Sequence, residues 1–283
     1  MPLSKKNKKV FGMILSISVV LSFIFIGFWF SLRVEDKKVA QTLPPVAETL
    51  KDKDNFVPKA ETFEIPVLMY HYVRDAENED QLGKNLSVSP GNFDTQMKWL
   101  KDNDYETVTL SDLADKERIA ISKIMLDEKR PIVITFDDGY DNAYTNAFPI
   151  LKRYGFTGTF FVIKNFTDKK PEYLTSAQIA EIQAANMEIG SHTLTHVDLA
   201  QSSTTTQTKQ IFDSKGDSLV FCYPAGKYDA EVKALVKEAG YVAAVTTKPG
   251  IATEKTDLWA IPRVRIDNSS LSVFTNKIDS AYN

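Results

Sequence analysis

The sequence has 283 residues, of which 43% are hydrophobic and 25% charged, a composition that suits one sizeable globular domain or two small ones. The net charge is -3, and the first nine residues hold four lysines and no acid, so residues 10–283 carry -7. An acidic chain without a basic stripe argues against nucleic acid as a partner. The single cysteine, Cys222, excludes an internal disulfide, so the fold depends on packing.

An uncharged apolar segment covers residues 10–32. As a helix it would be roughly 35 Å long, which is enough to cross a bilayer. The lysines before it predict that residues 1–9 are cytoplasmic and that the chain after the helix is extracytoplasmic. The segment is longer than a usual signal-peptide core and ends without a small-x-small site. We therefore expect an uncleaved, single-pass signal anchor in the cell membrane; the alternative is secretion after cleavage.

Residues 33–61 are rich in Lys, Glu, Asp, Thr and Pro, which predicts a flexible extracellular tether. Strand-like apolar runs then recur at residues 65–72, 132–136, 159–163, 187–191, 219–223 and 242–245. Helical patterns separate them, with start or stop signals at Ser89-Pro90, Gly155, Thr175 and Gly240. This alternation predicts a mainly parallel sheet. We expect one α/β domain at residues 62–283, a barrel or distorted barrel with its site at the strand carboxyl ends.

The apolar run Ile132–Phe136 stops abruptly on two carboxylates, Asp137 and Asp138, followed by Gly139. This pattern is typical of a buried strand that ends at the mouth of a site. Successive strand residues point to opposite faces, so the two acids cannot flank one bond as a glycosidase pair does. They must have different functions. The alternative is that both only cap the next helix and shape a turn.

Two of the three histidines, His192 and His196, follow a strand that ends in Gly-Ser. If this segment turns helically, residues four apart come about 5 to 6 Å apart and can share a metal ion, whereas an extended segment would separate them. Two imidazoles and one carboxylate, from Asp137 or Asp138, form a three-ligand site with open positions. The alternative is that each histidine is a surface or core residue.

Three segments, taken in order, resemble the first three motifs of a known family, the polysaccharide deacetylases (the NodB homology domain, carbohydrate esterase family four). The segments are Ile134–Gly139, His192–His196 and Tyr223–Gly226. The likeness spans roughly residues 65–283. It implies a distorted barrel of parallel strands that carries a divalent metal ion and removes acetyl groups from carbohydrate.

The resemblance assigns the metal ligands to Asp138, His192 and His196 and casts Asp137 as the catalytic base. The metal is usually zinc, although Co²⁺, Ni²⁺ or Fe²⁺ suits the same ligands. Such an ion polarises the carbonyl of an N-acetyl group and makes water more acidic. Asp137, on the other face of the strand end, can then accept a proton from that water.

By the same resemblance, the third motif, Tyr223-Pro224-Ala225, stabilises the oxyanion, with the backbone N–H nearest Ala225 as the donor. Proline and glycine around Ala225 suit a loop whose backbone faces the substrate. The aromatic side chains of Tyr72, Tyr140 and Tyr223 are candidates for the floor of a sugar groove.

The chain departs from the common family pattern at the general acid, because no histidine follows His196. His71 lies in the segment Leu68–Arg74, which is similar to a permuted branch that includes poly-N-acetylglucosamine deacetylases. The resemblance makes His71 the proton donor to the leaving amine, a function that suits imidazole.

A second departure concerns the arginine that orients the base, which the family commonly places where Cys222 or its neighbours stand. Arg263 or Arg265 could supply the guanidinium, or each is a surface charge. Cys222 lies in an apolar run, which predicts a small core residue instead of a nucleophile.

These features predict a membrane-anchored, metal-dependent N-deacetylase of N-acetylglucosamine polymers. The sequence leaves open peptidoglycan or a poly-N-acetylglucosamine exopolysaccharide as substrate, and it indicates no required protein partner. One alternative is an O-acetyl esterase on xylan-like glycans, because the same site hydrolyses esters. Another is a non-catalytic glycan-binding surface protein.

Overall fold

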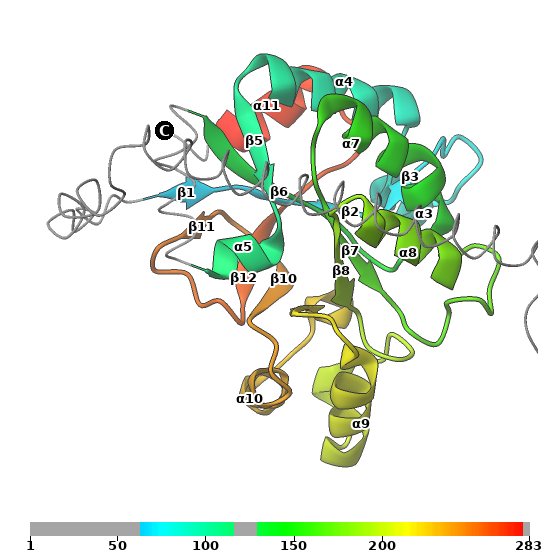
Figure 1. The fold of residues 1–283 in the computed structure, drawn as a ribbon, viewed down its shortest axis with the longest axis vertical. Coiled ribbons are helices and arrows are strands. Elements are labelled where there is room, and N and C mark those ends of the chain that lie inside the picture. Colours follow the sequence, from blue (N-terminus) through cyan, green and yellow to red (C-terminus); the bar gives the residue numbers. More distant parts are fainter. Residues whose placement is uncertain (1–62, 116–128, 280–283) are drawn as a thin grey trace, which may run out of the picture. The chain divides into compact units, whose positions relative to one another are not determined.

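The computed structural model describes residues 63–115 and 129–279 (Figure 1). The predicted cytoplasmic segment, signal anchor and tether, residues 1–61, lie outside the described residues. Within the two described ranges, no helix is both long enough and apolar enough to cross a bilayer.

Seven parallel strands form a closed ring, in which each strand pairs with the next and the last pairs with the first. In ring order they are β2 (Val67–Tyr70), β12 (Ile261–Arg265), β10 (Ala243–Pro249), β9 (Val220–Cys222), β8 (Glu188–Ser191), β7 (Thr159–Val162) and β6 (Arg130–Phe136). A further strand, β5 (Tyr105–Val108), pairs with β6 outside the ring. The pairing of β10 with β12 shifts register between Val245 and Pro249. The predicted distorted barrel is therefore confirmed.

Helices surround the ring in the connections between its strands, and one more follows the last strand (Figure 1). They are α3 (Gln81–Leu86), α4 (Pro90–Asp102), α5 (Leu110–Ala114), α7 (Phe148–Tyr154), α8 (Ser176–Ala184), α9 (Thr204–Lys215), α10 (Ala230–Glu238) and α11 (Leu271–Asp279). A π-helical turn, η1 (Ala143–Ala147), precedes α7. Two small sheets pair β1 (Glu64–Ile65) with β11 (Ala252–Thr253) and β3 (Tyr72–Val73) with β4 (Ser87–Val88).

Three of the predicted start and stop signals lie at helix ends in the structure. Ser89 caps α4 with Pro90 in its first turn, and Thr175 forms a capping box at the start of α8. Gly155 ends α7 in the left-handed conformation, with φ of 69°. These boundaries fix the lengths of the connections that bring the strands together.

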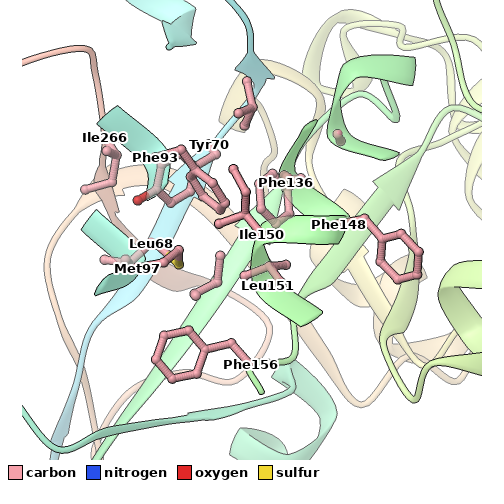
Figure 2. Close-up of a cluster of buried hydrophobic side chains, with 14 of the residues drawn as sticks. Leu68, Tyr70, Phe93, Met97, Phe136, Phe148, Ile150, Leu151, Phe156 and Ile266 are labelled. Atoms are coloured by element: carbon pink, nitrogen blue, oxygen red, sulfur yellow. The ribbon is translucent and has the colours of Figure 1, made fainter. Parts of the chain in front are cut away.

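Apolar side chains fill both faces of the barrel wall. Between the wall and helices α4 and α7, Tyr70 and Phe136 pack against Phe93, Met97 and Leu151 (Figure 2). A second cluster includes Val67, Val133, Phe161, Val220, Cys222, Val245 and Ile261. Because both faces are covered, the strands read as continuous apolar runs. Packing on both faces holds the strand ends in place.

Candidate functional site

Polar side chains gather where the parallel barrel strands end. His71 follows β2, Asp137 and Asp138 follow β6, and His192 follows β8. The register pairs Tyr70 with Phe136, so the residues that follow, His71 and Asp137, lie side by side. The backbone N–H of Asp137 donates to the carbonyl oxygen of Tyr70 at 2.9 Å. The carboxyl ends of the strands thus bring together residues that are far apart in the sequence.

Asp138, His192 and His196 form the predicted ligand cluster. Oδ1 of Asp138 lies 3.2 Å from Nε2 of His192 and 3.3 Å from Nε2 of His196. The three ligand atoms lie within 4.8 Å of one another. Atoms that are each about 2.1 Å from a tetrahedral Zn²⁺ are about 3.4 Å from one another. The spacing and chemistry of this donor set therefore fit one divalent metal ion.

A backbone carbonyl orients the His192 ring for this function. Nδ1 of His192 lies 2.7 Å from the carbonyl oxygen of Cys222. A carbonyl only accepts hydrogen bonds, so Nδ1 carries a proton, and Nε2 is the ring nitrogen that faces Asp138. Metal-binding histidines commonly have such an outer partner.

The His192–His196 segment forms a turn but not the helical turn that the spacing suggested. Thr193 and His196 have φ values of 68° and 59°, in the left-handed region. Buried Gln210 of α9 accepts from the backbone N–H groups of Leu194 and Thr195 at 3.0 and 3.1 Å. Tertiary hydrogen bonds therefore hold a turn that local preference disfavours in a β-branched residue such as Thr193.

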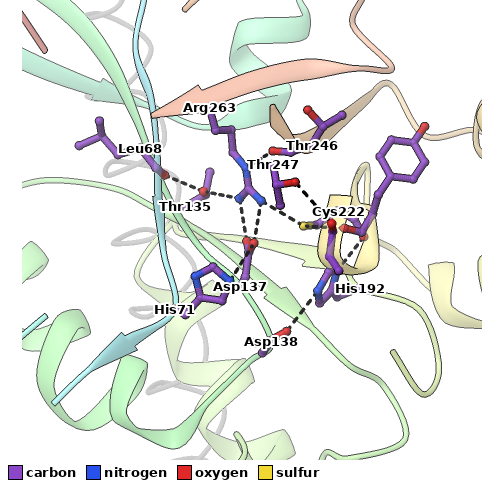
Figure 3. Close-up of polar contacts among 12 residues, drawn as sticks. Leu68, His71, Thr135, Asp137, Asp138, His192, Cys222, Thr246, Thr247 and Arg263 are labelled. Atoms are coloured by element: carbon purple, nitrogen blue, oxygen red, sulfur yellow. Dashed lines mark hydrogen bonds and ion pairs between the residues drawn. The ribbon is translucent and has the colours of Figure 1, made fainter. Parts of the chain in front are cut away.

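Asp137 points away from this cluster and pairs with Arg263 of β12 (Figure 3). Nη1 and Nη2 of the arginine donate to its two carboxylate oxygens at 2.7 and 2.6 Å. Both residues are buried, with 3% of Asp137 and 0% of Arg263 exposed. Burial alone would raise the pKa of Asp137, but the guanidinium outweighs it and lowers the pKa well below its ordinary value. Asp137 is therefore ionised and fixed in orientation.

The remaining donors of Arg263 are also used. Its Nε donates to the carbonyl oxygen of Thr246, Nη1 to the hydroxyl of Thr135, and Nη2 to Sγ of Cys222 at 3.5 Å. Of the two arginines considered in the sequence, Arg263 contacts Asp137, whereas Arg265 is exposed at the strand end. Burial raises the pKa of the Cys222 thiol, so it stays protonated. The prediction that Cys222 is a core residue is confirmed.

His71 lies beside Asp137 on the open side of the pair. Its Nε2 is 3.8 Å from Oδ2 of Asp137, and 14% of its side chain is exposed. Burial lowers the pKa of His71 below its ordinary value, although the nearby carboxylates oppose this shift. A partly exposed imidazole at this position can exchange a proton with a molecule bound over the site.

The third predicted motif presents its backbone. Tyr223 and Pro224 are buried, and the Tyr223 hydroxyl donates to the carbonyl of Trp259. Ala225 is exposed and has a φ of 50°. Among the described residues, its N–H donates no backbone hydrogen bond. The Tyr223 ring therefore cannot floor a sugar groove, whereas the Ala225 N–H is free to bind an oxygen.

The other two candidate groove aromatics have their faces covered. The rings of Tyr72 and Tyr140 stack with centroids 3.8 Å apart, and the Arg74 guanidinium lies 3.7 Å from the centre of the Tyr72 ring. Tyr140 also contacts the ring of Tyr173, at 5.0 Å between centroids. Both side chains are half-buried, and their place in the floor of a sugar groove stays a prediction.

Comparisons with known proteins agree with this geometry. Residues 126–244 match the family model for polysaccharide deacetylase. The Bacillus subtilis (strain 168) protein YxkH, named as a polysaccharide deacetylase, is 32% identical over 261 residues, which cover 88% of each chain. The chain belongs to the polysaccharide deacetylase family.

Among solved structures, the Streptococcus pyogenes deacetylase PplD in complex with acetate is 30% identical, with a TM-score of 0.69, over 77% of this chain and 99% of that one. The poly-beta-1,6-N-acetyl-D-glucosamine N-deacetylase of Staphylococcus aureus (strain MSSA476) is 26% identical over 75% of this chain and 82% of its own. IcaB from Ammonifex degensii, 20% identical with a TM-score of 0.62, shares the fold.

The deacetylase family match omits two residues of the site. His71 and Arg263 lie on either side of residues 126–244, and the barrel brings them to Asp137 from strands β2 and β12. Two further residues of the site, Gln210 and Thr246, were not predicted; Gln210 binds the histidine turn, and the carbonyl of Thr246 accepts from Arg263. Both are ordinary polar residues in their own segments, so the sequence offers no signal for them.

Proposed function

We propose that this deacetylase is a metal-dependent hydrolase that removes acetyl groups from N-acetylglucosamine residues of a cell-surface polysaccharide. The observation that carries the proposal is the Asp138, His192 and His196 donor set beside the ion-paired Asp137 and the partly exposed His71. The similarity to deacetylases, including one named for poly-beta-1,6-N-acetyl-D-glucosamine, supports the substrate class.

In this proposal Asp138, His192 and His196 hold one divalent cation, most suitably Zn²⁺, with Co²⁺, Ni²⁺ or Fe²⁺ as alternatives. The bound cation would supply Lewis-acid chemistry, which polarises the acetyl carbonyl and favours the deprotonation of water. His192 is oriented for this function by the Cys222 carbonyl, which accepts from Nδ1 and leaves Nε2 as the atom that would bind the cation.

Two protein groups beside this site carry out the proton transfers, Asp137 as the base and His71 as the acid. Asp137 accepts a proton from the attacking water, while Arg263 holds its carboxylate in position. The water oxygen bonds to the acetyl carbon, and the Ala225 N–H donates to the former carbonyl oxygen. His71 then donates a proton to the nitrogen as the carbon–nitrogen bond breaks. The products are acetate and a free amine on the sugar.

The location of the enzyme is part of the same proposal. Residues 10–32 anchor the chain in the cell membrane, and residues 62–283 act outside the cytoplasm. A domain in that position reaches peptidoglycan or a secreted poly-N-acetylglucosamine. We expect no nucleic acid and no required protein partner.

The test is acetate release by the full chain from matched β-1,4 and β-1,6 N-acetylglucosamine oligomers, with the bound metal quantified. We expect release that stops when a chelator removes the metal and returns when Zn²⁺ is added. Asp137→Asn should lower kcat by about 10²- to 10⁴-fold. Asp141→Asn is the matched control, because Asp141 binds Gln178 outside the proton path.

Other outcomes would identify the alternatives. Release from O-acetylated xylan but not from N-acetyl oligomers would make the protein an esterase. Binding of sugar without acetate release from either substrate would make it a glycan-binding protein. Full activity of Asp137→Asn would refute the assignment of the base.

A further inference from the structure

The segment that carries His71 is tied to the rest of the site on both sides. Before His71, the Tyr70 carbonyl accepts from the N–H of Asp137 at 2.9 Å. After it, two side chains bind the peptide groups of Val73. Oδ1 of Asn142 accepts from the Val73 N–H, and Nδ2 of Asn146 donates to the Val73 carbonyl, both at 2.7 Å.

An irregular turn places these two asparagines. They lie at the start and within the π-helical turn η1, where the N–H of Phe148 donates to the carbonyl of Ala143, five residues earlier. Pro149 follows in the first turn of α7. Proline has no N–H, and its ring clashes with the carbonyl four residues before it, here that of Thr145. The widened turn relieves that clash, and such turns often lie at functional sites.

We propose that Asn142 and Asn146 form an amide clamp on Val73 that positions His71 for proton donation. This inference rests on the proposed function, in which His71 protonates the leaving amine. Asn142 accepts one hydrogen bond from Val73, and Asn146 donates the other to it. Together the two bonds fix both the position and the orientation of the strand that follows His71. The clamp also joins His71 to the helical segment that begins a few residues after the acid pair, so the proton donor and Asp137 share one support.

The position of the His71 ring relative to Asp137 depends on the clamp. His71 lies 3.8 Å from Asp137, and its side chain is partly exposed. Among the described residues, the polar contact of the ring is the one to Asp137, so its orientation depends also on the backbone on either side. A displacement of about 1 Å can lower turnover by about 100-fold. Asn142 and Asn146 are therefore positioning residues, since they act through His71 and not on substrate.

Two substrates separate positioning of the proton donor from general structural support. The amine of an N-acetylglucosamine oligomer leaves only when it is protonated. In 4-nitrophenyl acetate, by contrast, the water oxygen bonds to the acetyl carbon and nitrophenolate leaves with the electron pair, without a proton. Loss of the clamp should lower turnover of the oligomer and spare the ester.

Asparagine-to-aspartate variants make this test sharp, because a carboxylate accepts hydrogen bonds but cannot donate them. Asn146→Asp and Asn142→Ala should each lower kcat on the oligomer by about 10- to 100-fold, with KM within about twofold and ester turnover within about threefold. Asn142→Asp keeps its acceptor and should restore most of the activity that Asn142→Ala loses.

A matched control is Asn103→Asp, which removes a similar bond, from Nδ2 to the carbonyl of Trp99 at 2.8 Å, at the end of α4. It should leave both activities unchanged. Equal loss on both substrates, or equal activity of Asn146→Asp and wild type, would overturn the clamp alone. Wild-type enzyme that releases no acetate from any N-acetyl oligomer would overturn the proposed function, and this inference with it.

Discussion

Replacing Arg263 by methionine should destabilise the protein strongly, because it leaves the Asp137 carboxylate buried without its partner. The change removes two charge-assisted hydrogen bonds, at 2.7 and 2.6 Å, from a residue that is 3% exposed. Breaking a buried ion pair from one side costs about 3 to 5 kcal/mol. We expect the free energy of unfolding to fall by that amount near neutral pH.

The loss should depend on pH in a defined direction. In the wild type, Arg263 lowers the pKa of Asp137, so this stabilisation is present above the unfolded pKa and is lost as the pH falls through the folded pKa. In Arg263→Met, burial without the guanidinium raises the pKa of Asp137 above its unfolded value. In this variant the contribution of Asp137 to stability is therefore lost as the pH rises. The difference between the two proteins should therefore be smaller at about pH 4.5 than at about pH 7.5.

Urea unfolding at both pH values measures this difference. Adding Asp137→Asn to Arg263→Met should recover most of the lost stability, because no buried charge remains. Arg265→Met, on the same strand but exposed, is the control and should change the stability by at most about 0.5 kcal/mol. A loss below about 1 kcal/mol for Arg263→Met, or one that does not change with pH, would refute the reasoning.

Three further predictions concern the site and its support. His71→Ala should keep its metal content and lose most of its turnover; loss of the metal would instead make His71 a ligand. Gly226→Ala should impair acetate release, because its Cβ would lie 2.0 Å from Oγ1 of Thr247, whereas Gly155→Ala, at a similar φ and with open space, should cost only about 1 kcal/mol of stability. Burial raises the pKa of Glu188, so its contribution to stability is present below the unfolded pKa and is lost as the pH rises. Urea unfolding should show wild type losing stability relative to Glu188→Gln as the pH rises above the ordinary pKa of a glutamate, about 4.

The sequence predicted the separate directions of the acid pair, because alternation along a strand follows from backbone geometry. It could not choose between Arg263 and Arg265, since residues two apart point to the same face. The choice depends on depth: Arg263 lies inside the ring, and Arg265 lies at the strand end, level with Met69. Depth follows from the register of β12 on β2, which joins segments about 200 residues apart.

The turn between His192 and His196 shows a second limit. Their spacing indicated that the segment must turn, but its left-handed residues depend on Gln210, a side chain on another element. Local preference disfavours the left-handed conformation in a residue such as Thr193, and tertiary hydrogen bonds override it. The stacking of Tyr72 on Tyr140 could not be predicted for a similar reason, because the sequence does not show which ring faces are covered.

The position of Arg263 on β12 has a consequence for biosynthesis. β12 is the last barrel strand along the chain, and it closes the ring between β10 and β2. While the nascent chain lacks residues 261–265, Asp137 has no guanidinium to neutralise it, and a bare carboxylate resists burial. The ribosome must therefore release nearly the whole domain before the site can assemble. A polypeptide interrupted earlier should remain an open, inactive sheet.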